Sequence, residues 1–107
     1  MALSQLQTIS ISRGDTKEIS ISITSGSLGV NDKIVFSFGS IGTNGNYIPL
    51  VTKTVTSTDL SFTITHQDSL QKVGNYYYDF RVIRDDGTIT TLCLPSNFII
   101  LGVVANV

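Results

Sequence analysis

Charged side chains are scarce in this sequence of 107 residues. Asp, Glu, Lys and Arg make up 14% of it, whereas they make up about 25% of ordinary soluble domains. The net charge is −1, so nothing attracts the chain to a phosphate backbone or to anionic lipid. No apolar run approaches the ~20 residues of a membrane span. We therefore expect neither a nucleic acid nor a membrane among the partners of this protein.

Cysteine is almost absent and tryptophan is missing altogether. The single cysteine, Cys93, excludes an internal disulfide framework and a cysteine-rich zinc site. Its alternation with Ile89 and Thr91 predicts a packed thiol and not a reactive one. The lack of tryptophan and of paired cysteines excludes an immunoglobulin domain of the antibody type.

Few side chains could converge to catalyse a reaction or to hold a metal ion. His66, Asp68 and Ser69 lie in one short segment, whereas the members of a catalytic triad come from separate segments. One histidine, one cysteine and scattered carboxylates give no cluster with metal-ligand spacing. Residues 85–87, Asp-Asp-Gly, lack the later oxygen ligands of a calcium loop and predict a hairpin turn. We expect no catalytic residue, no metal site and no cofactor, and therefore a protein that is not an enzyme.

Alternation of apolar and polar residues with a period of two dominates the chain. It is present in residues 7–12, 18–24, 33–38, 60–65 and 76–82. Such alternation predicts strands with one buried and one solvent-facing side, which is typical of antiparallel sheets. For two of these strands the expected inward-facing residues are Ile34, Phe36, Phe38, Tyr76, Tyr78, Phe80 and Val82.

Two segments depart from this alternation. Residues 48–55 change phase after Leu50, which predicts a β-bulge or an edge strand. Residues 66–73 show no alternation and predict a single helical turn, with Thr65 or Asp68 as its cap.

Residues 13–15 spell Arg-Gly-Asp, the tripeptide that integrins bind. Gly14 permits a backbone conformation with positive φ, which a tight turn between two strands requires. We therefore interpret the tripeptide as a structural turn and not as an adhesion motif.

These strands and turns predict one domain, residues 1–107, with an all-β fold. Seven or eight short strands indicate a two-sheet antiparallel immunoglobulin-like β-sandwich, with a small barrel as the alternative. The segment Gly74-Asn75-Tyr76 predicts a tyrosine corner, in which the tyrosine hydroxyl bonds back to nearby backbone. Residues 98–107 carry no charged side chain, so we expect an apolar C-terminal strand or assembly tail there.

The order of several motifs resembles that of a known family. The series consists of residues 13–16, 19–23, 74–80, 86–88 and 98–100. It resembles the small β-sandwich structural domains of tailed-bacteriophage tail and baseplate proteins, and it is similar to the N-terminal domain of baseplate upper proteins. The resemblance spans roughly residues 9 to 101.

This resemblance implies a non-enzymatic structural protein of a phage or prophage virion. It would bind copies of itself and other tail or baseplate proteins after synthesis in the cytoplasm of the bacterial host. The start of the chain lacks the basic segment of a secretory signal. This agrees with the expected synthesis in the cytoplasm. The alternative is a bacterial surface or secreted immunoglobulin-like module for adhesion or glycan binding.

Candidate assembly contacts are two tyrosines and the uncharged C-terminal residues. We expect Tyr47 in a loop and Tyr77 on an outer face, and surface tyrosines are frequent at protein–protein contacts. Phe98 and Ile100 would point to one face of the last strand. The remaining apolar residues then lack cover, and an apolar edge without lysine pairs with another chain. The predicted contacts, which imply a homo-oligomer, are Tyr47, Tyr77, Ile99, Leu101, Val103, Val104 and Val107.

Overall fold

The computed structural model describes residues 2–3, 8–92 and 96–102. They form ten β-strands, and none of them belongs to a helix long and apolar enough to cross a membrane. The strands are β1 (Ala2–Leu3), β2 (Ile9–Ser12), β3 (Lys17–Ser20), β4 (Ile23–Ser25), β5 (Lys33–Ile41), β6 (Tyr47–Thr56), β7 (Ser61–Ile64), β8 (Gly74–Ile83), β9 (Ile89–Thr91) and β10 (Ser96–Leu101).

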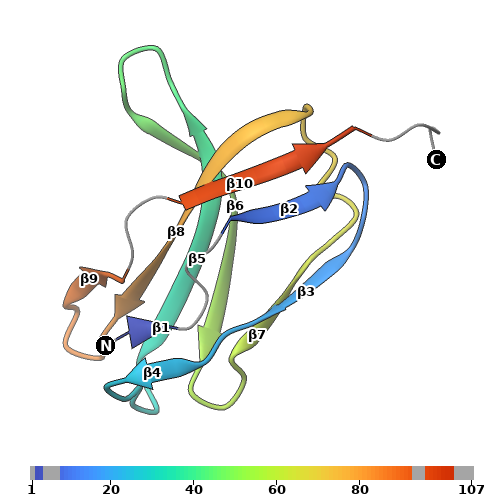
Figure 1. The fold of residues 1–107 in the computed structure, drawn as a ribbon. Helices are drawn as coiled ribbons and strands as arrows, with labels where there is room; N and C mark the ends of the chain where they lie inside the picture. The colour runs from blue at the N-terminus through green and yellow to red at the C-terminus, as the bar shows by residue number, and fades with distance from the viewer. Residues whose placement is uncertain (1, 4–7, 93–95, 103–107) are drawn as a thin grey trace.

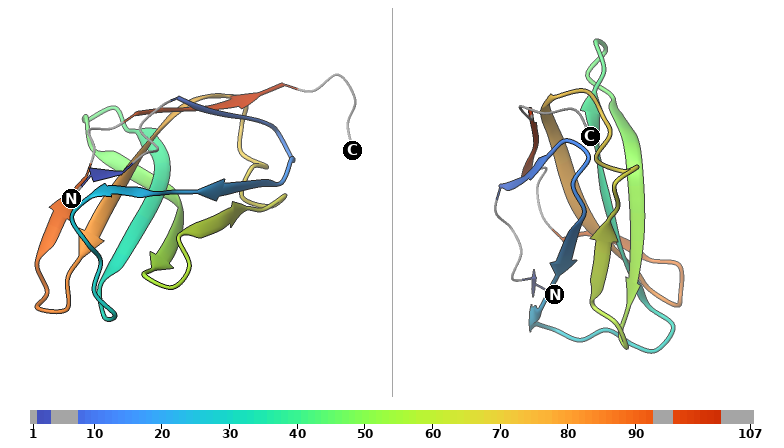
Figure 2. Two further views of the ribbon diagram at one scale, coloured as in Figure 1. Left: turned by 60° about the horizontal axis from the view of Figure 1, so that its bottom comes forward. Right: turned by 90° about the vertical axis from the view of Figure 1, so that its right-hand side faces the viewer.

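Two layers of strands face each other (Figure 1, Figure 2). One layer is a six-stranded sheet with the order β2-β10-β8-β5-β6, in which β9 also pairs with β8. The other layer consists of two ribbons, β3 with β7 and β1 with β4. The expectation of an all-β, sandwich-like fold is confirmed.

One pair of strands contradicts the prediction of a wholly antiparallel sandwich. β2 runs parallel to β10, with Ile9 opposite Phe98 and Ile11 opposite Ile100. The other strand pairs of the described residues are antiparallel. Alternation of apolar and polar residues indicates that one face of a strand is buried, but it does not indicate the direction of the neighbouring strand. A short parallel pair at the edge of a sheet can also have one buried face.

The structure has more strands than the seven or eight expected, partly because one predicted strand is divided. Residues 18–24 fall into β3 and β4, which pair with different partners, β7 and β1. Between them Ile21 donates its backbone N–H to the carbonyl of Leu60 at 2.9 Å. Ile19 and Ile21 are both buried, so the alternation continues while the chain changes its pairing partner.

The core lies between the two layers and consists largely of aromatic rings. All the inward-facing residues predicted for β5 and β8 are buried. Phe38 stacks on Phe98 with ring centroids 4.1 Å apart, which joins two strands of the large sheet. Phe36 stacks on Phe62 of β7 at 4.6 Å, so the same cluster also holds the two layers together.

β6 contains the predicted irregularity. Val51 pairs with Phe38 and Pro49 pairs with Gly39, so Leu50 has no partner on β5 and forms a bulge. β6 is also the last strand of the large sheet. The predictions of a bulge and of an edge strand are therefore both confirmed.

The connection between β7 and β8 also follows the predictions. Asp68 donates its backbone N–H to the hydroxyl of Thr65 at 3.2 Å, and its carboxylate accepts the N–H of Thr65 at 2.9 Å. Ser69 donates its N–H to the carbonyl of Thr65 at 3.2 Å, which closes a single turn. Further on, the hydroxyl of Tyr76 donates to the carbonyl of Lys72. The capped turn and the tyrosine corner are both present.

Candidate functional site

The prediction that Tyr47 lies in a loop is wrong, because Tyr47 is the first residue of β6. β5 and β6 stay paired as far as Ile41 and Tyr47, so their hairpin is longer than the alternation indicated. The Tyr47 hydroxyl lies 3.1 Å from Oγ of Ser37 and donates to the carbonyl of Tyr77 at 3.4 Å. Burial raises the pKa of the Tyr47 hydroxyl. These contacts hold the half-buried ring over the outer face of the large sheet.

Two adjoining hollows surround Tyr47, and together they are named the Tyr47 hollow. Their volumes are about 220 Å³ and 240 Å³, and both are lined by Tyr47, Asp79 and Arg81. Tyr77 and Ile41 line one of them. Nε of Arg81 lies 3.4 Å from Oδ2 of Asp79. The structure thus brings the two predicted tyrosines together beside an ion pair on one face of the sheet.

Three large apolar side chains near the end of the β5–β6 hairpin are exposed. The exposed fractions are 50% for Ile41, 48% for Ile48 and 42% for Leu50. The hairpin, green in Figure 1, extends away from the rest of the sheet, so no other described strand covers its end. The pattern of the sequence does not mark these residues as exposed. The available signal was the presence of apolar residues on both sides of the glycine-rich turn at 42–46.

In the described part of the C-terminal segment, side chains alternate between the core and the outer face as predicted. Phe98 and Ile100 are buried in the core, whereas Ile99 is half-buried and Leu101 is 47% exposed. Since side chains alternate along a strand, Ile99 and Leu101 belong to the outer face on which Tyr77 lies. The other predicted contacts, Val103, Val104 and Val107, lie outside the described residues.

Cys93 also lies outside the described residues. The prediction of a packed thiol relied on the alternation of Cys93 with Ile89 and Thr91. Both of these residues are exposed, as is the whole of β9. The structure of β9 therefore gives that prediction no support.

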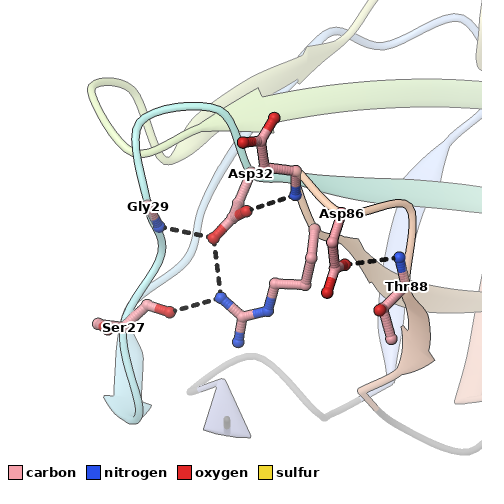
Figure 3. A network of polar contacts seen from close by, with 7 residues as sticks. Ser27, Gly29, Asp32, Asp86 and Thr88 are labelled. Atoms are coloured by element: carbon pink, nitrogen blue, oxygen red, sulfur yellow. Dashed lines mark hydrogen bonds and ion pairs between the residues drawn. The ribbon is translucent and has the colours of Figure 1, made fainter.

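A buried carboxylate joins the loop before β5 to the β8–β9 hairpin (Figure 3). Oδ2 of Asp32 accepts from the N–H of Gly29 at 2.8 Å and from Nη1 of Arg84 at 2.9 Å. Its Oδ1 accepts from the N–H of Asp85 at 2.8 Å. The hydrogen bonds from Gly29, Arg84 and Asp85 lower the pKa of Asp32. The predicted hairpin turn is confirmed, with Gly87 at a φ of 89°.

His66 and Ser69 contact the backbone of the Arg-Gly-Asp turn through their side chains. Nδ1 of His66 lies 2.6 Å from the carbonyl of Gly14, and Oγ of Ser69 donates to the carbonyl of Asp15 at 2.7 Å. Gly14 has a φ of 87°, as the interpretation of a structural turn requires. The side chains of His66 and Ser69 therefore stabilise the backbone of this turn.

Asp68 lies in the same segment but has a different partner. Its Oδ2 lies 2.7 Å from Nζ of Lys53 on β6. Burial would raise the pKa of Asp68, but the hydrogen bonds from Lys53 and Thr65 outweigh it and lower the pKa. Among residues 2–3, 8–92 and 96–102, no three His, Cys, Asp or Glu side chains gather to hold a metal ion.

Comparisons with known proteins bear on the fold. No protein-family model matches the sequence, and no curated protein matches it. Among solved structures the chain is similar to CopC from Methylosinus trichosporium OB3b, with a TM-score of 0.51 and 16% sequence identity. The match covers 100% of this chain and 95% of that chain. At this identity the likeness shows the fold alone, a β-sandwich.

Proposed function

We propose that this protein is a structural protein of a phage or prophage virion, a tail or baseplate component without enzymatic activity. It acts by self-assembly and by contacts with other tail or baseplate proteins. We further propose that its sandwich is of the immunoglobulin-like type. The strand order supports this, because β2 lies parallel to β10 at one edge of the large sheet and β3 pairs with β7 in the other layer.

The exposed apolar end of the β5–β6 hairpin is the observation that carries this proposal. Ile41, Ile48 and Leu50 are each about half exposed, and leaving apolar surface in water costs about 25 cal/mol per Å². Ile41 pairs with Tyr47 and Ile48 pairs with Ser40, so the two isoleucines point to opposite faces of the hairpin. Its end therefore offers exposed apolar side chains on both faces, and such surface marks contact sites. Tyr47 and Tyr77 lie beside Ile41 in the Tyr47 hollow, and tyrosine is enriched at protein contacts. This part of the molecule is suited to bind a neighbouring protein.

The C-terminal segment supports contacts between copies of the chain. Leu101 is exposed at the end of β10, and residues 103–107 carry no charge. The predicted contacts Ile99, Leu101, Val103, Val104 and Val107 all belong to this segment. We therefore propose a homo-oligomer, assembled in the host cytoplasm and incorporated into the virion.

Mass spectrometry of purified phage particles tests the proposal. We expect the protein in particles released by the bacterium that carries its gene, in a constant ratio to the tail proteins. The double variant Ile41→Ser, Ile48→Ser should fold but be lost from the particles. Ile89→Ser, which changes an apolar residue that is 60% exposed on β9, is the matched control and should be retained. Particles that lack the parent protein would contradict the proposal.

One observation favours the alternative, a surface or secreted module for adhesion or glycan binding. The Tyr47 hollow combines two aromatic rings with Asp79 and Arg81, and sugars bind to such mixtures of aromatic and hydrogen-bonding groups. Binding to a glycan array that is lost in Tyr77→Ala and retained in Ile89→Ser would favour this function over the first.

A further inference from the structure

An open slot runs along the side of the sandwich where two edge strands face each other. β2 ends the large sheet and β3 ends its own ribbon, and no described strand pairs with their facing edges. The turn at residues 13–16 joins the two strands, so they border the same side of the molecule (Figure 2). We name the space between them the β2–β3 slot.

Two adjoining hollows occupy this slot, with Lys17 between them. Their volumes are about 230 Å³ and 320 Å³. Both are lined by Ser10 and Lys17, so they follow the edge of β2 from end to end. The first is lined by residues 8–10 and 17–20, and the second by residues 10–12, 15–17 and Leu101.

The backbone of β2 directs hydrogen-bonding groups into the slot. Nζ of Lys17 donates to the carbonyl of Ser10 at 3.4 Å, so this carbonyl faces the slot. The N–H and C=O of a strand residue point to the same edge, so the N–H of Ser10 faces the slot as well, while Ile9 and Ile11 bond toward β10. An exposed lysine at this distance is easily displaced. The carbonyl of Ser12 on the same edge already accepts the N–H of Asp15 at 2.9 Å. The N–H and C=O of Ser10 and the N–H of Ser12 are therefore the groups of β2 with which an added strand can pair.

Residues 103–107, Val-Val-Ala-Asn-Val, have the composition that such an edge accepts. Three of them are β-branched, and none is charged or proline. In extended form five residues span about 17 Å, which exceeds the length of a four-residue strand such as β2. Leu101, two residues before this segment, lines one end of the slot and is 47% exposed.

The geometry favours the slot of a second copy over the slot of the same chain. β10 runs parallel to β2, and the N–H of Arg13 donates to the carbonyl of Leu101 at 2.9 Å, so the two chains stay joined beyond Ser12. The turn at residues 13–16 closes the β2–β3 slot at that end. To enter its own slot the segment would have to reverse around this closed end. Even a tight reversal uses two residues, so only part of the segment 103–107 would be left to pair. A neighbouring copy can supply the whole segment.

We propose that residues 103–107 of one copy pair as an added strand with the free edge of β2 in the β2–β3 slot of a second copy. This inference rests on the proposed function, because it names the site at which the assembling module binds itself. Strand addition takes its affinity from main-chain hydrogen bonds and its specificity from alternate side chains. Each copy gives one segment and offers one slot, so the contact is head-to-tail and leads to a ring or an open array.

Light scattering of the full chain tests this proposal. We expect the parent to associate with rising concentration and a chain that ends at Leu101 to stay monomeric. Ser10→Pro removes the N–H that faces the slot but no bond to β10, and it should weaken association at least tenfold. Ser10→Ala removes only the hydroxyl and should associate like the parent. Equal association of the proline and alanine variants overturns the proposal.

Amide hydrogen exchange gives a second measurement that needs no substitution in β2. The amides of Ser10 and Ser12 should exchange at least tenfold more slowly in the oligomer than in the chain that ends at Leu101. Protection that persists when the parent is diluted to monomers would place the segment in its own slot and overturn the proposal.

The outcomes also separate this proposal from the proposed function. If Ser10→Pro still associates while the chain that ends at Leu101 is monomeric, the slot is wrong but self-assembly stands. If Ser10 and Ser12 are protected in the oligomer and the protein is absent from phage particles, the slot stands and the virion function fails.

Discussion

Gly39 is the residue at which the bulge of β6 limits the choice of side chain. A Cβ at this position would stand 2.0 Å from the carbonyl oxygen of Ile48, and a backbone atom cannot move aside as the end of a side chain can. We expect Gly39→Ala to lower the free energy of unfolding by about 2–3 kcal/mol. Urea denaturation measures this change. Gly102→Ala is the control, because no heavy atom of residues 2–3, 8–92 and 96–100 lies within 4 Å of the added carbon. Equal denaturation midpoints for the two variants would contradict the bulge.

Gly14 carries a different constraint, that of its backbone conformation. Its φ is 87° and the nearest atoms to an added Cβ, in His66, are 3.5 Å away, so space is available but the conformation is unfavourable. Gly14→Ala should lower the free energy of unfolding by about 1 kcal/mol, measured by thermal melting. Asp15→Glu should change neither melting nor assembly. Unchanged melting of the glycine variant, with integrin-dependent cell attachment by the parent, would overturn the interpretation of a structural turn.

Asp32 makes stability depend on pH. Three hydrogen bonds lower its pKa in the folded protein, so the folded state binds this proton less readily than the unfolded chain. Its contribution to stability is complete above the unfolded pKa of about 3.9 and is lost as the pH falls through the lower folded pKa. We expect the denaturation midpoint of the parent to fall more steeply on acidification below about pH 4 than that of Asp32→Asn. Parallel curves for the two proteins would contradict this role.

At the scale of the elements, the tyrosine corner fixes the connection from β7 to β8. The hydroxyl of Tyr76 donates to the carbonyl of Lys72, while its ring is buried against the core. Tyr76→Phe keeps the ring and removes the hydrogen bond, so we expect a loss of about 1 kcal/mol in the free energy of unfolding. Chemical denaturation measures it. Tyr77→Phe, whose side chain lies on the outer face, is the control and should change stability less.

The elements that could be predicted from the sequence are those whose pattern is local. Inward-facing and outward-facing residues alternate in much of β5 and β8. The residue types typical of tight turns predicted the turns that contain Gly14 and Gly87. The parallel pairing of β2 with β10 could not be predicted, because the two strands are distant in the sequence and alternation is the same for either direction. Lys53 lies opposite the buried Phe36 and therefore on the inner face of the sheet. There it forms an ion pair with Asp68, which lies in a turn after the next strand and could not be assigned to Lys53 from the local pattern.

The candidate site was predictable only in part, for a related reason. Tyr47 and Tyr77 were selected as exposed aromatic residues, and the structure brings them together because β6 and β8 flank β5. The exposure of Ile41 and Ile48 depends on how far the hairpin extends beyond its neighbours. That length is a property of the sheet and not of the hairpin sequence, so these residues were missed.

At the scale of the whole molecule, the scarcity of charge bears on how copies associate. With a net charge of −1 and only 14% charged residues, ion pairs can contribute little to a contact between copies. The contacts proposed for residues 99–107 are apolar and main-chain, and neither kind is weakened by salt. Association should therefore depend on the C-terminal segment and should not weaken as the ionic strength rises.

Light scattering at fixed protein concentration, in about 0.05 to 1 M NaCl, checks this expectation. The weight-average mass of the parent should stay constant or rise over this range, because salt screens exposed charges and favours apolar burial. The chain that ends at Leu101 should remain monomeric throughout, since it lacks the uncharged segment. A parent that dissociates as salt rises would show that ion pairs hold the copies together. A parent that is monomeric at high micromolar concentration in every buffer, with a protease-labile and dispensable C-terminal end, would rule out self-assembly through this segment.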